Sequence, residues 1–178
     1  MTSTTATGWD ALQKRLDTVQ KPVATFRLCQ DSDLRDRYLD AKKEADEAAR
    51  YLKSLDKDAD REVRTMVEKQ AAAAAAALKA VQPEYEQATI TLRFTALERR
   101  QLEELQSRHP ASEEDEAAGQ DYAMDTFAPA LIAAASLDGM PEDYARKCLD
   151  TWGPGDARDL WEAAWSVQQH RRADLGKG

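Results

Sequence analysis

The chain has 178 residues, of which 42% are hydrophobic and 33% charged. This length suits one domain or two small ones with a buried core, and the composition is that of a globular protein with long, solvated helices. No apolar run approaches the roughly 20 residues that span a bilayer, and the first ten residues, MTSTTATGWD, lack the basic and apolar parts of a signal peptide. We therefore expect a soluble, cytosolic protein that does not bind a membrane.

The net charge of −8 is unevenly distributed along the chain. Residues 1–95 hold 16 basic and 16 acidic side chains, whereas residues 96–178 hold 9 basic and 17 acidic ones. The acidic second half would repel a phosphate backbone, and the first half has no uncompensated basic block. The distribution therefore disfavours nucleic-acid binding.

The N-terminal region, residues 1–22, is predicted to hold one short amphipathic helix. Residues 1–8 are rich in Thr and Ser and are predicted to be disordered. Apolar side chains then recur at helical spacing at Trp9, Leu12, Leu16 and Val19. Pro22 is expected to end this helix.

Residues 23–95 are predicted to form a helical arm flanked by two short β-strands. The segments Val23–Cys29 and Ala88–Thr95 are rich in β-branched and aromatic residues and alternate in polarity, as strands do. About 50 residues of helix-forming sequence lie between them, and Pro83 is expected to close the last helix of the arm.

Two stripes of small and apolar residues run along this arm. The first follows the alternating steps of a heptad repeat, as in a coiled coil, at Leu34, Tyr38, Ala41, Ala45, Ala48, Leu52 and Leu55. The second is predicted at Val63, Val67, Gln70, Ala74, Ala77 and Val81. Between the stripes lies the polar segment Asp56–Asp60. The chain either turns there into an antiparallel α-hairpin or continues as one long helix with a stutter. We favour the hairpin because it would let the two strands pair.

Residues 96–178 are predicted to form a small, acidic C-terminal helical bundle, which makes the fold class mainly α with a minor β part. Helices are predicted at residues 96–108, 126–136, 141–151 and 156–172, and an acidic linker at residues 111–123. Asp125 or Thr126 is the predicted N-cap of the second of these helices, with Pro129 in its first turn. Leu160, Ala164 and Val167 are the predicted buried stripe of the last helix.

We find no constellation of residues that indicates catalysis. The sequence has no glycine-rich phosphate loop, GxSxG, HExxH or calcium-binding loop. His109 and His170 are interpreted as a helix-end and a solvated residue, and Cys29 and Cys148 as unreactive thiols. We therefore predict no catalytic, cofactor-binding or metal-binding residues, and a protein that is not an enzyme.

Aromatic and apolar side chains of the second half form the candidate site. Because Trp and Tyr dominate binding hot spots, we predict that a protein partner contacts Phe127, Leu131, Ile132, Trp152, Trp161 and Trp165. The alternative is that these residues anchor the core of the bundle. In the helix that holds Phe127, we expect Phe127 and Leu131 to face the core, and Ala130, Ile132 and Ala133 to meet the partner if they are exposed.

Three sequence blocks follow the strand PVATFRL and the charged arm. They are ITLRFTALERRQLEELQSRHP at residues 90–110, MDTFAPALIAAASLDG at 124–139 and LDTWGPGDARDLWEAAWSVQ at 149–168. Their order and spacing resemble the tail assembly chaperones of long-tailed, siphovirus-type actinobacteriophages and prophages, over roughly residues 21–172. The chain departs from that pattern in its alanine run and in Gln168 and Gln169, where an asparagine is expected.

The resemblance implies a non-catalytic protein that binds the tape measure protein and tail-tube subunits. It would keep them soluble in the host bacterial cytoplasm and be absent from the mature virion. A structural phage tail or head-completion protein and an unrelated helical adaptor or regulatory protein stay open as alternatives. The oligomeric state also stays open, a homo-oligomer included.

Overall fold

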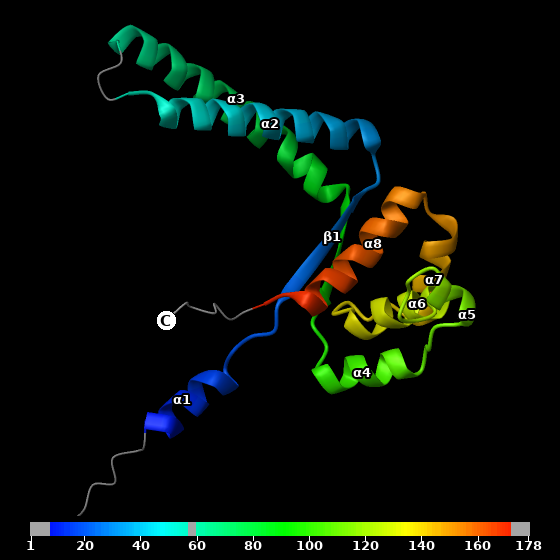
Figure 1. The fold of residues 1–178 in the computed structure, drawn as a ribbon. Helices are drawn as coiled ribbons and strands as arrows, with labels where there is room; N and C mark the ends of the chain where they lie inside the picture. Colours follow the sequence, from blue (N-terminus) through cyan, green and yellow to red (C-terminus); the bar gives the residue numbers. More distant parts are fainter. Residues whose placement is uncertain (1–7, 57–59, 172–178) are drawn as a thin grey trace, which may run out of the picture. The chain divides into compact units, whose positions relative to one another are not determined.

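A computed structural model describes residues 8–56 and 60–171 of the chain. The elements are α1 (Gly8–Asp17), β1 (Val23–Cys29), α2 (Ser32–Ser54), α3 (Arg61–Gln87), β2 (Thr89–Thr95), α4 (Arg99–Ser107), α5 (Glu113–Ala117), α6 (Met124–Ala135), α7 (Glu142–Thr151), α8 (Pro154–Ser166) and the 3-10 helix η1 (Val167–Gln169). They confirm the predicted fold class, mainly α with two short strands (Figure 1). None of the described helices is both long and apolar enough to cross a membrane. The predicted disorder of residues 1–8 falls, apart from Gly8, outside the described residues.

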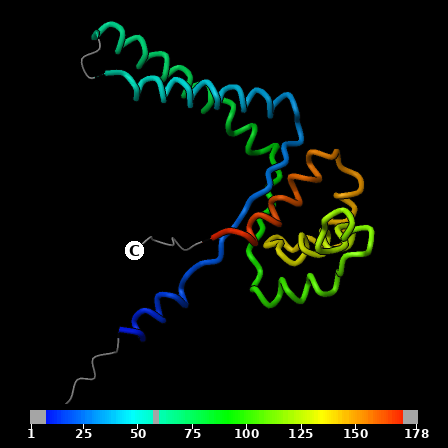
Figure 2. The backbone as a smooth tube through the Cα atoms, viewed as in Figure 1, coloured from blue at the N-terminus to red at the C-terminus, as the bar shows by residue number. Residues whose placement is uncertain are grey.

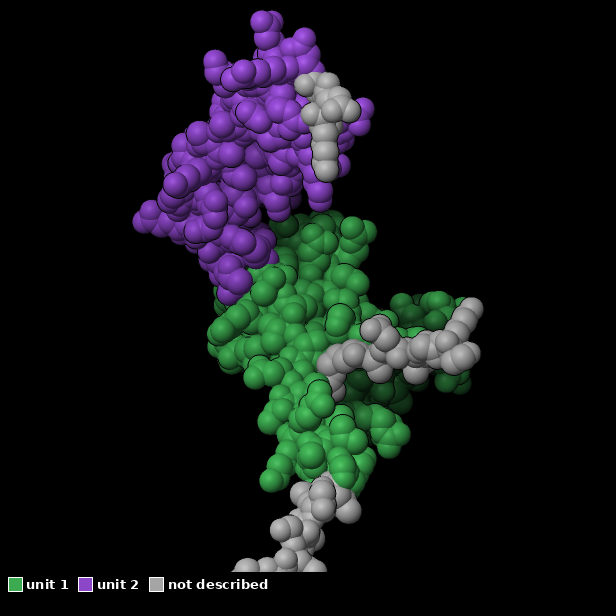
Figure 3. Space-filling model, turned by 90° about the vertical axis from the view of Figure 1, so that its left-hand side faces the viewer, with its two compact units in different colours: residues 1–26, 92–178 green, residues 27–91 purple. Residues whose placement is uncertain are grey.

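The described residues divide into two compact units (Figure 3). One runs up to residue 26 and resumes at residue 92, and the other comprises residues 27–91. The sequence-based division into residues 1–22, 23–95 and 96–178 did not group the N-terminal segment with the C-terminal helices.

Strands β1 and β2 form a two-stranded antiparallel sheet, which Figure 2 shows as two neighbouring backbone segments. The backbone N–H of Gln30 donates to the carbonyl of Ala88 at 3.0 Å, and that of Ala96 donates to the carbonyl of Pro22 at 3.3 Å. These two bonds bracket the sheet and define its register. The first strand has its predicted bounds, and the second begins one residue later than predicted because Ala88 is the C-cap of α3.

Helices α2 and α3 pack side by side and form the predicted α-hairpin rather than one long helix (Figure 1). Each helix begins at an aspartate that caps a free backbone N–H. The Asp31 carboxylate accepts from Leu34 N at 3.0 Å, and the Asp60 carboxylate accepts from Glu62 N at 2.8 Å. The predicted turn at Asp56–Asp60 lies between the two helices, although residues 57–59 are outside the described part of the chain.

The predicted stripe of α2 is confirmed, since all seven of its residues are buried or half-buried. The predicted stripe of α3 is partly wrong, because Val63, Gln70 and Ala77 are exposed. The residues of α3 that are buried or half-buried are Arg64, Val67, Ala71, Ala74, Leu78, Val81 and Tyr85. Val67 before the alanine run and Leu78 after it set this phase, since the seven alanines between them do not differ in side chain from one face to another.

Pro83 does not end α3, contrary to the prediction. A proline removes one N–H from a helix and is strongly disfavoured in its interior. Here the turn beyond Pro83 carries Tyr85, which is buried in a cluster with Leu34 and Val81. The Tyr85 ring also stacks on Tyr38, with ring centroids 3.8 Å apart. We attribute the continuation of the helix to Gln87 to this packing.

The core of the other unit is built around α6, which packs against α4, α7 and α8. Seven of its twelve residues are buried, as expected for a mostly apolar helix surrounded by other elements. The predicted stripe of the last helix, Leu160, Ala164 and Val167, is also buried and is confirmed.

Pro129 lies in the sixth position of α6, later than the predicted first turn, and its position creates a specific contact. Proline has no N–H to donate to the carbonyl four residues earlier. That carbonyl belongs to Asp125, and it accepts a hydrogen bond from Arg146 Nη1 on α7 at 2.8 Å. The predicted N-cap at Asp125 or Thr126 is wrong, because α6 begins earlier and its N-cap is Ala123.

The other helix boundaries of this unit differ from the predictions at their N-termini. Helix α4 begins at Arg99 rather than at residue 96, because Glu98 and Gln101 form a capping box there. Pro141 is the N-cap of α7 rather than its first residue. Helix α8 begins at Pro154, two residues before the predicted start, since proline is well suited to the first helical position. The predicted end near residue 172 is also wrong for α8, which ends at Ser166 before η1; residue 172 itself lies outside the described residues.

The acidic segment at residues 111–123 was predicted as an irregular linker, but it contains the five-residue helix α5. Ser112 and Asp115 form a capping box that begins this helix, and the same hydrogen bonds lower the pKa of the Asp115 carboxyl. Capping therefore gives local order to a segment whose composition alone suggested none.

Two polar contacts attach β2 to the helices that follow it. The Arg93 guanidinium bonds the Asp138 carboxylate at 2.6 Å, and the Arg93 backbone N–H donates to the same carboxylate at 2.7 Å. These hydrogen bonds lower the pKa of Asp138. The Gln168 side chain accepts from Leu97 N at 2.8 Å and donates to the carbonyls of Thr95 and Ala164, at 3.2 and 2.9 Å.

Candidate protein-interaction site

The structure places three of the six predicted partner-binding residues in the core. Phe127, Leu131 and Ile132 have no exposed surface. Ala130, on the side of α6 that we expected to meet a partner, is also buried, and Ala133 is half-buried. Because α6 has neighbouring helices on several sides, it presents no apolar face for a partner in this conformation.

Trp161 and Trp165 are half-buried and lie at the edge of this core. Their rings stack on one another with centroids 5.4 Å apart, and each directs its ring edge-to-face against Phe127, at 6.0 and 6.1 Å. Tyr122 completes the aromatic group, with its ring 4.2 Å from that of Phe127. Burial raises the pKa of the Tyr122 phenol, and the nearby Asp121 charge adds to that effect. The two tryptophans are therefore outer members of a core cluster, with part of each ring at the surface.

Trp152 lies apart from this pair. It is the half-buried C-cap of α7, and its ring stacks on Phe26 of β1 with centroids 5.9 Å apart. The six predicted residues are thus divided between the centre of the core, its aromatic edge and the contact with β1.

An exposed apolar face that the sequence had shown only as a helical stripe lies on α1. Trp9, Leu12 and Leu16 of α1 are 62%, 49% and 59% exposed, and Val19, two residues beyond the end of the helix, is 50% exposed. No residue of α1 is buried. A free helix of this length is marginal in water unless its apolar face is covered. The helical spacing of these residues was sufficient to predict this face. The partner-binding site was instead predicted at the aromatic residues of the second half.

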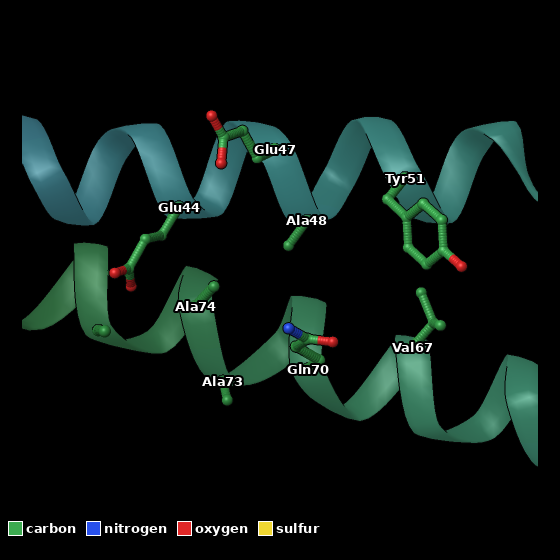
Figure 4. A pocket seen from close by; sticks show the side chains of 9 residues that line it. Glu44, Glu47, Ala48, Tyr51, Val67, Gln70, Ala73 and Ala74 are labelled. Carbon is green, nitrogen blue, oxygen red and sulfur yellow. The ribbon is translucent and has the colours of Figure 1, made fainter.

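A groove of about 670 Å³ runs between α2 and α3, on the surface of the hairpin. Its lining residues are Glu44, Glu47, Ala48, Tyr51, Val67, Gln70, Ala73, Ala74 and Ala77. Figure 4 shows the side chains of Glu44, Ala48 and Tyr51 directed from α2 toward α3, whereas Glu47 points away from α3. We call this feature the hairpin groove. The alanine run, expected to act mainly as a helical spacer, supplies three of its nine lining residues.

None of the histidines and cysteines lines the hairpin groove or belongs to α1, and the His109 ring lies 6.2 Å from that of Phe127. His109 Nδ1 is 3.0 Å from Thr126 Oγ1, and His170 is exposed. Cys148 is a buried free thiol whose pKa is raised by desolvation, and Cys29 donates to the carbonyl of Asp31 at 3.2 Å. Within residues 8–56 and 60–171, no group of three or more His, Cys, Asp or Glu side chains is placed to hold a metal ion.

Comparison with known proteins adds no identification. No family model, no curated protein and no solved structure matches this chain.

Proposed function

We propose that this protein is a tail assembly chaperone of a long-tailed phage or prophage. In this role it binds the tape measure protein and tail-tube subunits in the host bacterial cytoplasm and keeps them soluble until the tail tube polymerises. The order and spacing of the three C-terminal sequence blocks support the proposal. The blocks coincide with β2 and α4, with α6, and with the end of α7 through α8, so each contributes to one compact helical unit.

The exposed apolar face of α1 is the structural observation that carries the proposal. A chaperone that holds aggregation-prone helices needs apolar surface that its own fold leaves uncovered. Covering the exposed half of a Trp or Leu side chain is worth about 1 kcal/mol. The three side chains of this face, together with Val19 just beyond the helix, could therefore contribute several times that value to client binding without any change in the protein's own core.

The proposal is tested by co-expressing the chain with the tape measure protein encoded beside it. We expect wild type to increase the soluble fraction of that protein and to form a complex with it that survives gel filtration. The variant Trp9→Ser/Leu12→Ser/Leu16→Ser should lose most of this effect. The control Gln13→Ser/Lys14→Ser/Asp17→Ser alters exposed residues between and beside these positions and should retain it.

Two results would contradict the proposal. If wild type neither raises the solubility of the tape measure protein nor forms a complex with it, the adaptor or regulatory alternative gains. If mass spectrometry finds the chain in purified virions at stoichiometric amounts, the structural-protein alternative is favoured instead.

A further inference from the structure

The hairpin groove carries an inference about the chemistry of a partner. We infer that this groove binds a basic amphipathic helix of a client protein, laid along the groove between α2 and α3. The inference rests on the proposed function for the identity of the client, but the groove itself determines the kind of helix that fits.

The shape of the groove suits a helix packed closely against the hairpin. Its lining includes four alanines, and small side chains permit the shorter of the usual distances between helix axes. Tyr51 and Val67 lie at one end and supply larger apolar surface. From Glu44 to Tyr51 the groove follows two turns of α2, or about 10 Å at 1.5 Å per residue. A partner segment of about two to three helical turns would therefore fill it.

The charge of the groove selects the partner's side chains. Glu44 and Glu47 line it, and neither carboxylate forms an ion pair or hydrogen bond with another described residue. No lysine or arginine is among the nine lining residues. The basic residues Arg50 and Lys53 line a separate hollow on α2 instead. The groove thus has two carboxylates without a cation, which a partner carrying Lys or Arg beside its apolar stripe would supply.

The same observation disfavours a second copy of this chain as the occupant. Two copies that met symmetrically through this surface would each present the same two glutamates and no basic residue. Alanines could still pack against alanines, but the carboxylates would stay without a partner. Charge complementarity therefore favours a different, basic helix.

The charge requirement is tested by fluorescence anisotropy with the full-length protein and a labelled synthetic peptide. The peptide has 14 residues of Lys, Ala and Leu, with Leu and Ala on one helical stripe and Lys beside it. We expect Glu44→Gln/Glu47→Gln to weaken binding about fivefold at low salt, as expected for the loss of two exposed ion pairs. The control Asp46→Asn/Glu68→Gln makes the same charge change outside the groove and should leave affinity unchanged. Equal weakening by both variants, or equal binding of a peptide with Glu in place of Lys, would overturn the inference.

The location is tested by a pair of alanine substitutions in one run. Ala73 and Ala76 are both exposed on α3, but only Ala73 lines the groove. Ala73→Gln should fill the groove and weaken peptide binding at least about fivefold, whereas Ala76→Gln should not. Circular dichroism of both variants verifies that the helix content is retained. If sedimentation shows that the protein alone dimerises and that Ala73→Gln dissociates the dimer, the occupant is a second copy and the inference fails.

Co-expression with the tape measure protein separates this inference from the proposed function. A client complex that persists in Ala73→Gln and in Glu44→Gln/Glu47→Gln would overturn the groove inference and leave the proposed function standing. Peptide binding with the expected variant pattern, but no client complex, would support the groove and remove the proposed function.

Discussion

Gln168 joins three segments of one unit through a single side chain. Its amide bonds Leu97 N and the carbonyls of Thr95 and Ala164, so it connects the end of β2 with α8. Removal of this amide leaves a half-buried backbone N–H and two carbonyls with fewer partners.

We expect Gln168→Ala to lower the free energy of unfolding by about 2 kcal/mol, because unpaired polar groups in the protein interior are costly. Gln169→Ala, at the exposed neighbouring position, should change it by less than about 0.5 kcal/mol. Denaturant unfolding of the full chain measures both. Gln168→Asn is a sharper test, since a side chain shorter by one methylene should not make all three bonds. Wild-type stability in Gln168→Asn would show that the three bonds contribute little.

Asp138 gives the protein a defined dependence on pH. Hydrogen bonds from the Arg93 side chain and then from its backbone lower the Asp138 pKa below the unfolded value of about 3.9. The ionised carboxylate therefore stabilises the fold above the unfolded pKa, and this contribution is lost as the pH falls through the folded pKa.

We expect wild type to melt at a higher temperature than Asp138→Asn at pH 7, and the difference to shrink as the pH falls below the unfolded pKa of about 3.9 and through the lower folded pKa. Thermal unfolding monitored by circular dichroism across this range measures it. A difference that stays constant with pH would mean that the charge of Asp138 is irrelevant and that only its shape matters.

At the scale of elements, local chemistry made the strands and most helices predictable. Val23–Cys29 alternates β-branched, aromatic and polar residues, and that pattern determines a strand wherever a partner is available. The stripe of α2 was equally clear, because its leucines and its tyrosine stand among charged residues. In α3, seven successive alanines carry no periodicity, so the sequence does not indicate which of them face α2.

Helix α6 shows why the site was harder to predict than the fold. The sequence-based prediction placed one face of this helix in the core and another against a partner, because short helices are commonly amphipathic. Its mostly apolar composition was the better signal, since a helix that is apolar over most of its surface is usually buried. The number of helices around it depends on tertiary packing, which a single sequence does not display.

The contact of Arg146 with Asp125 leads to a prediction about the helix that contains Pro129. Pro129→Ala supplies the N–H that the Asp125 carbonyl lacks, so the carbonyl should depend less on Arg146. We expect Arg146→Ala to cost about 1 kcal/mol in the wild-type background and less in Pro129→Ala. The loss of the Arg146–Glu142 ion pair occurs in both backgrounds, so its free energy cancels in this double-mutant cycle. A coupling energy of zero would contradict the assignment.

At the scale of the whole molecule, the half-buried and the exposed tryptophans are expected to contribute differently to stability and to partner binding. Trp161 and Trp165 pack on the core cluster that includes Leu105 and Phe127, whereas Trp9 lies on a helix with no buried residue. Substitution of Trp161 and Trp165 should therefore lower the stability of the fold. Substitution of Trp9 should alter only the binding of the proposed partner.

We expect Trp161→Ala/Trp165→Ala to lower the free energy of unfolding by about 3 kcal/mol or more, as for other large-to-small changes at core positions. Trp9→Ser/Leu12→Ser/Leu16→Ser should leave the melting temperature within about 2 °C of wild type. Calorimetry of the full chain compares them. An unchanged melting temperature in the tryptophan variant would instead indicate that Trp161 and Trp165 are available for partner binding, as the sequence predicted.

The register of the sheet has a consequence for the history of this chain. Since Gln30 and Ala88 are hydrogen-bonded neighbours, the whole of α2 and α3 is inserted where an ordinary β-hairpin would have a tight turn. The hairpin can thus be lengthened or shortened by matched heptads in both helices, or replaced by a short Asn-Gly turn, while the strand ends keep their places. Related chains should accordingly differ most in the length of this insertion, while the strands that border it keep their register.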